Sequence, residues 1–90
     1  MNMKKLEIIT AIDKRISNSK KVDYEIWTIG ITNNPERRKG EHGKEHNVKY
    51  WRDWKADSEN DAREIENHFQ DKRVKGGGGG GENPTYVYIF

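Results

Sequence analysis

The chain has 90 residues, of which 31% are hydrophobic and 36% charged, and its net charge is +2. This length allows one domain with a small core, so we treat residues 1–90 as a single domain. The absence of cysteine excludes disulfides and thiolate metal sites. No apolar stretch is long enough to span a bilayer, which predicts a cytoplasmic protein without membrane contact. Because phosphate binding depends on local positive charge, the small net charge does not identify a partner.

Residues 3–17 and 22–31 form the first two predicted elements. Apolar residues at helical spacing predict a helix over the first segment, and they are Leu6, Ile9, Ile12 and Ile16. The second segment has the pattern of a strand with apolar side chains on both faces, which is typical of a central strand covered on each side. Its two faces would carry Tyr24 and Ile26 on one side, and Trp27, Ile29 and Ile31 on the other.

A polar helix is predicted to follow this strand. Asn34 is suited to cap the helix, and Pro35 to be its first residue. No large apolar side chain occurs between Pro35 and His46, so burial cannot be the purpose of this helix. Arg38 and His42 are four residues apart and share one face. Two interpretations remain: a solvated surface helix with ion pairs between its turns, or a cationic face that grips phosphate.

Residues 47–54 and 58–74 form the next predicted strand and helix. The strand alternates, with Val48, Tyr50 and Trp54 on one side and Trp51 on the other. With so few aliphatic residues available, the three tryptophans are expected in the core, and base stacking is the alternative. The helix opens with a pattern like a capping box at Ser58, and its buried stripe would be Ala62, Ile65 and Phe69.

Six consecutive glycines, residues 76–81, separate this helix from the end of the chain. They lack the Lys-Ser/Thr and the helix of a phosphate-binding loop, so they predict a flexible loop. Residues 85–90 have an aromatic at every second position and apolar groups on both faces, which predicts an interior strand. The order of elements predicts an α/β fold with a small three-stranded sheet flanked by helices.

A carboxylate lies on the rim of the apolar stripe of helix 58–74. At about 100° per residue, Glu66 falls on the same half of the helix as the stripe, whereas Glu64 points away. Such a carboxylate needs an ion pair, a metal ion or water. One interpretation is a rim residue whose carboxylate reaches water, or a salt bridge with Arg73 or Lys72. The other is metal-assisted phosphodiester cleavage, in which a Glu holds the cation, an Arg stabilises the transition state, and a His or Tyr is the base.

The order and spacing of these residues resemble the GIY-YIG nuclease superfamily. Thr28-Ile29-Gly30 stands where the family has Tyr-Ile-Gly. Arg38 follows Gly30 by eight residues, at the position of the family's catalytic arginine. His42 matches a frequent histidine of the following helix.

Two later features extend the resemblance toward residue 84. Ala62-Arg63-Glu64-Ile65-Glu66 is similar to the family's Ala-x-x-x-Glu signature, which makes Glu66 the candidate metal ligand. Asn83 lies about where the family has its terminal asparagine.

The chain departs from the family in two places. Thr28 replaces the tyrosine of the second motif, and the first motif, a Gly-Ile-Tyr strand, is missing upstream. The comparable strand is Tyr86-Val87-Tyr88-Ile89, at the other end of the chain. This favours the hypothesis of a circular permutation, in which the last strand pairs with strand 22–31 and Tyr88 takes the place of the first-motif tyrosine. The alternative is that Tyr88 belongs only to the core.

The resemblance implies a nucleic-acid-binding domain that cleaves phosphodiester bonds as an endonuclease with Mg²⁺ or Mn²⁺, on DNA rather than RNA. Arg38 would stabilise the phosphate, Glu66 would hold the metal, and Tyr88 or His42 would be the base. The residues expected to contact nucleic acid are Arg37, Lys39 and Asn83. The alternative is a catalytically degenerate module that binds nucleic acid or protein. So small a surface is compatible with a dimer or a larger assembly.

Overall fold

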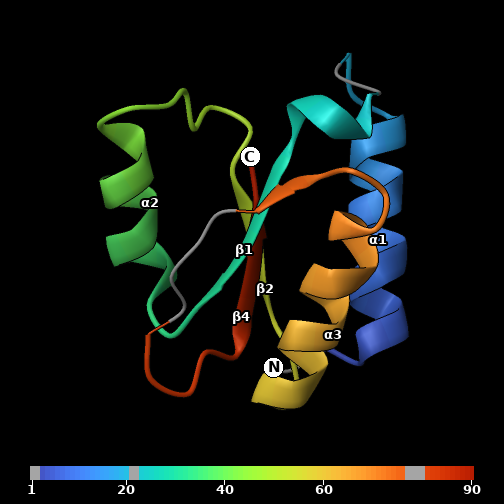
Figure 1. The fold of residues 1–90 in the computed structure, drawn as a ribbon, viewed down its shortest axis with the longest axis vertical. Coiled ribbons are helices and arrows are strands. Elements are labelled where there is room, and N and C mark those ends of the chain that lie inside the picture. The colour runs from blue at the N-terminus through green and yellow to red at the C-terminus, as the bar shows by residue number, and fades with distance from the viewer. Residues whose placement is uncertain (1–2, 21–22, 77–80) are drawn as a thin grey trace.

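The chain forms a small α/β fold with three α-helices and a four-stranded mixed sheet (Figure 1). The computed structural model describes residues 3–20, 23–76 and 81–90. Its elements are α1 (Lys5–Ser17), η1 (Tyr24–Ile26), β1 (Thr28–Thr32), α2 (Pro35–Gly43), β2 (Arg52–Lys55), α3 (Glu59–Gln70), β3 (Lys75–Gly76) and β4 (Tyr86–Ile89). Within these segments, no helix combines the length and apolar character needed to cross a membrane.

The sheet has the strand order β2-β4-β1-β3. β4 is antiparallel to both of its neighbours, whereas the short β3 is parallel to β1. β1 and β4 are therefore the two interior strands of the sheet. This confirms the prediction that the strand ending at residue 31 is central and that the C-terminal strand is interior. The prediction of three strands is wrong, because β3 is a fourth. A strand of two residues carries no apolar alternation by which the sequence could reveal it.

The helices cover the two faces of the sheet unequally. Figure 1 shows α1 and α3 on one side of the sheet and α2 alone on the other. The hydrophobic core lies on the α1–α3 side, and α2 contributes no buried residue. The core consists of Ile8, Ile12, Ile16, Trp27, Ile29, Ile31, Trp54, Ala56, Ala62, Ile65, Phe69, Val74, Val87 and Ile89.

The predicted first helix is correct in place but not in its buried face. α1 buries Ile8, Ile12 and Ile16, whereas Leu6 is 72% exposed and Ile9 is half-buried. Two apolar stripes run along this helix at helical spacing, and only the position of α3 and the sheet decides between them.

The predicted strand 22–31 begins later than expected. Tyr24–Ile26 forms a 3₁₀ turn, because the Asp23 carboxylate accepts the backbone N–H of Glu25 at 3.0 Å and so favours a turn. Residue 22 lies outside the described residues. The apolar face of the strand is confirmed, since Trp27, Ile29 and Ile31 are all buried.

Two further boundaries differ from the predictions. The strand expected over residues 47–54 is limited to Arg52–Lys55, because the preceding residues form a turned connection. The third helix starts at its predicted cap, where the Ser58 hydroxyl accepts the N–H of Asp61 at 3.1 Å. It ends at Gln70 rather than near residue 74, and the left-handed Arg73, with φ of 74°, turns the chain away.

The buried stripe of α3 is as predicted, with Ala62, Ile65 and Phe69 all buried. Of the predicted glycine loop, Gly76 belongs to β3 and Gly81 has a left-handed φ of +73°. Residues 77–80 lie outside the described part of the chain.

Candidate active site around Tyr88

Tyr88 is the centre of the candidate site, and the pairing of β1 with β4 places it. Tyr88 lies directly opposite Gly30 in this antiparallel pair. A Cβ atom on Gly30 would lie 2.2 Å from the Tyr88 hydroxyl oxygen and 2.4 Å from Cζ. The phenol ring therefore lies across the bare backbone of Gly30, and only glycine leaves room for it. Tyr88 is fully buried but does not belong to the core cluster.

The start of α2 fixes how this helix is presented to Tyr88. The buried Thr32 ends β1, and its hydroxyl oxygen accepts the N–H of Asn34 at 3.1 Å. The Asn34 side chain in turn accepts the N–H of Arg37 at 3.1 Å, and Pro35 is the first helical residue. The predicted cap is confirmed. A capped, proline-started helix directly after a buried strand has little freedom to turn.

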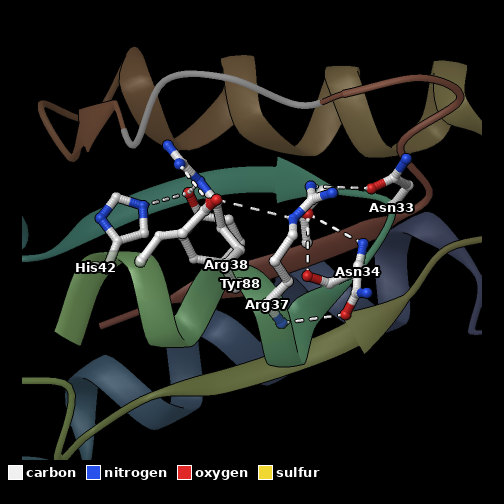
Figure 2. Close-up of polar contacts among 8 residues, drawn as sticks. Asn33, Asn34, Arg37, Arg38, His42 and Tyr88 are labelled. Carbon is white, nitrogen blue, oxygen red and sulfur yellow. Dashed lines mark hydrogen bonds and ion pairs between the residues drawn. The ribbon is translucent and has the colours of Figure 1, made fainter. Parts of the chain in front are cut away.

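Arg38 and His42 of α2 converge on the Tyr88 hydroxyl (Figure 2). His42 Nε2 lies 2.9 Å from this oxygen, and Arg38 Nε donates to it at 3.4 Å. Arg38 also pairs through Nη1 with Glu41 at 3.0 Å. The polar helix is thus not only a solvated helix with ion pairs between its turns. One of its faces closes over a buried phenol.

Burial keeps both His42 and the Tyr88 phenol in their neutral forms, and Arg38 is the group that favours ionisation of the phenol. The pKa of His42 is lowered, first by burial and then by the charges of Arg38 and His46. A neutral His42 can accept a hydrogen bond from Tyr88 through Nε2. The pKa of Tyr88 is raised by burial, while the hydrogen bond and charge of Arg38 act in the opposite direction. Arg38 therefore offsets part of the cost of a phenolate.

An aromatic stack that the sequence did not predict supports the phenol. The ring of Trp51 lies 4.4 Å from that of Tyr88 at an interplanar angle of 9°, and its Nε1 donates to Asp53 at 2.8 Å. Phe90 continues the stack at 5.7 Å from Trp51. The expectation of three core tryptophans holds for Trp27 and Trp54 but not for the half-buried Trp51. Only the register between β2 and β4 brings Trp51 and Tyr88 together, and the sequence does not state that register.

An open hollow of about 450 Å³ lies beside this cluster. Its wall includes Arg38 and His42 from α2, Lys75 from β3 and the half-buried Thr28 from β1. Both signs of charge occur there, since Glu41 and Glu45 also line it. Thr28 therefore lines the same hollow as Arg38 and His42. It is also the position at which the chain departs from the GIY-YIG pattern.

Glu66 lies near enough to this cluster for its charge to act on Tyr88, but no hydrogen bond among the described residues joins it to Arg38, His42 or Tyr88. Neither predicted salt bridge forms, because Arg73 pairs with Glu25 and Lys72 pairs with Asp13. Glu66 is half-buried, and burial raises the pKa of its carboxyl group. Its charge is also close enough to Tyr88 to help raise the pKa of the phenol, after the larger effect of burial.

The fit of a divalent metal to this site depends on Glu66. Among the described residues, no group of three or more His, Cys, Asp or Glu side chains could enclose an ion. The structure also gives the Glu66 carboxylate no hydrogen bond or ion pair with a described residue. A half-buried carboxylate without such a partner suits an ion such as Mg²⁺, which keeps several waters and takes one or two protein carboxylates.

The other predicted contact residues lie away from the phenol. Arg37 donates to the side chain of Asn33 at 3.2 Å (Figure 2). Asn33 donates to the carbonyl of Glu82 at 3.0 Å, which ties the start of α2 to the segment before β4. Lys39 is exposed on α2. Asn83 is exposed with a left-handed φ of 51° and makes no hydrogen bond to the Tyr88 cluster in the described chain.

No protein-family model, curated protein or solved structure matches this chain.

Proposed function

We propose that the protein is a divalent-metal-dependent endonuclease that cleaves phosphodiester bonds, with DNA as the expected substrate. The observation that carries this proposal is the convergence of Arg38 and His42 on the buried hydroxyl of Tyr88. A phenol between a histidine acceptor and an arginine donor is arranged to release its proton.

The proposed roles follow from this geometry. His42 takes the phenol proton through Nε2, and Tyr88 can then accept a proton from the attacking water. The guanidinium of Arg38 stabilises the negative charge first on the phenol and then on the phosphate that enters the hollow. Glu66 would hold the metal ion, which when bound polarises the phosphate and stabilises the leaving oxygen.

The same arrangement supports a more specific proposal about the fold, namely a circularly permuted GIY-YIG-like domain. The last strand pairs with the strand that carries Gly30, and Tyr88 lies opposite that glycine, as the permutation hypothesis requires. The histidine and the arginine of the resemblance both reach the phenol that would replace the first-motif tyrosine.

A second candidate function is nucleic-acid binding without cleavage. Thr28 in the wall of the hollow favours it, since the family has a second phenol at this position. A site with one phenol and one carboxylate could retain phosphate affinity through Arg38 after losing hydrolysis.

Plasmid nicking tests the proposal. We expect the wild-type protein to cut DNA with Mg²⁺ or Mn²⁺ and Glu66→Gln to lose at least about a hundredfold in rate, since a neutral amide is a poor ligand for a hard cation. Glu64→Gln is the matched control, because it makes the same change on the exposed side of α3. Equal cutting by wild type and Glu66→Gln would remove Glu66 from the mechanism.

Two further outcomes separate the candidate functions. No cutting by the wild type, together with salt-dependent DNA binding that falls for Arg38→Gln and survives Glu66→Gln, would select the binding module. Neither cutting nor binding would reject both functions.

A further inference from the structure

A second pocket lies between the last turns of α1 and the edge strand β2, away from the Tyr88 site. It has a volume of about 370 Å³. Three cations line it, Lys14, Arg15 and Arg52, together with the aromatic side chains of Tyr50 and Trp54. None of the described residues in its lining is acidic. The pocket shares no lining residue with the hollow beside Tyr88.

The three cations of this pocket form no ion pair with a described residue, a property they share with exposed lysines such as Lys39 and Lys44 but not with the paired cations of the described chain. Lys5, Arg37, Arg38, Arg63, Lys72 and Arg73 each form an ion pair with a carboxylate. No ion pair among described residues involves Lys14, Arg15 or Arg52. Concentrated positive charge without a protein counter-charge is a site for an anionic ligand.

Arg15 supplies a second, independent observation. Its Nη2 donates to the carbonyl oxygen of Tyr50 at 3.3 Å, which fixes the guanidinium in the pocket wall. Its Nε is buried and has no hydrogen-bond partner among the described residues. A buried charged donor left without an acceptor is costly, and an oxygen of a bound anion would remove that cost.

We infer that the α1–β2 pocket binds a phosphate ester. A phosphate oxygen would accept from Arg15 Nε after a rotation of the guanidinium that exposes this buried atom, and Lys14 and Arg52 would neutralise the remaining charge. The partial negative charge at the C-terminal end of α1 is about half an elementary charge, too small to cancel three cations. The exposed side chain of Tyr50 offers aromatic surface to a planar base attached to the phosphate. This inference does not depend on the proposed nuclease activity.

The test follows the Arg15 Nε–H resonance by NMR while adenosine monophosphate is added. We expect the nucleotide to shift this resonance and adenosine, which has no phosphate, to leave it in place. The double variant Lys14→Gln/Arg52→Gln changes two exposed side chains and keeps Arg15, and it should bind the nucleotide at least about tenfold more weakly. Arg63→Gln, outside both sites, should bind within about twofold of the wild type.

A 12-nucleotide single strand distinguishes the two sources of phosphate. If it shifts the same resonance and displaces the mononucleotide, the pocket serves a nucleic-acid strand. If the mononucleotide binds and the strand does not displace it, the pocket serves a free nucleotide. An unmoved Arg15 Nε–H resonance with both ligands, or equal affinity in the double variant and Arg63→Gln, overturns the inference.

Discussion

At the scale of single residues, two small side chains shape the candidate site. Gly30 leaves the space that the Tyr88 phenol fills, and Thr28 leaves the hollow without a second phenol. Both positions belong to the Thr28-Ile29-Gly30 segment, which the sequence identified through its resemblance to the Tyr-Ile-Gly motif. The sequence could not show that the glycine is required by one particular tyrosine 58 positions later (88 − 30).

Replacing Gly30 with alanine should displace Tyr88. The new methyl group would overlap the phenol at 2.2 Å, and overpacking of this kind costs about 1–3 kcal/mol. We expect a lower free energy of unfolding in urea and loss of the His42–Tyr88 contact. Gly40→Ala is the control, because its Cβ would meet no atom within 4 Å and alanine favours a helix. Equal stability of the two variants would contradict the described contact.

His42 should titrate below its usual pKa of 6.5, since burial and the charge of Arg38 both disfavour its protonated form. Arg38→Gln should raise this pKa toward 6.5, whereas Lys39→Gln, the neighbouring exposed cation, serves as the control. NMR of the histidine ring protons measures both. In the proposed mechanism the neutral form accepts the phenol proton, so the proposed nuclease activity should be lost as the pH falls through this lowered pKa. The same His42 pKa in both variants would remove Arg38 as a cause.

At the scale of elements, patterns of five or more residues were predictable and short connections were not. The caps of α2 and α3 follow from Asn34-Pro35 and from Ser58, because each depends on chemistry within one helical turn. The turn at Tyr24 and the strand β3 were missed. In both, a hydrogen bond to a partner decides the local structure, and apolar periodicity does not report it.

The turn at Tyr24–Ile26 is held to α1 by one side-chain contact that can be tested. The Tyr24 hydroxyl donates to Asp13 at 2.6 Å, and this hydrogen bond is the first cause that raises the pKa of Tyr24 to about 12. Tyr24→Phe should lower the free energy of unfolding by about 1 kcal/mol. Tyr86→Phe is the control, since no described residue hydrogen-bonds its hydroxyl. Equal losses in the two variants would show that the bond to Asp13 adds nothing.

At the scale of the whole molecule, the core lies on one face of the sheet and the Arg38–His42–Tyr88 cluster lies toward the other, whereas the candidate metal ligand Glu66 comes from α3 on the core side. The apolar core lies on the α1–α3 side, whereas α2 carries arginine and histidine toward the opposite face. A helix that contributes no buried residue can present charged groups without weakening the core. The pocket at the edge of β2 lies outside this division and offers a second charged surface.

The sequence by itself determined the helices, the two main interior strands and the face of α2 that carries Arg38 and His42. These depend on periodicity and capping, which act over a few residues. Only the tertiary structure decided that Tyr88 lies over Gly30 and that Trp51 stacks on the Tyr88 ring. It also decided that Glu66 forms no ion pair with a described residue and that Arg15 has a buried donor without an acceptor. Each of these depends on strand register or helix placement, and these are set by the packing of residues far apart in the chain.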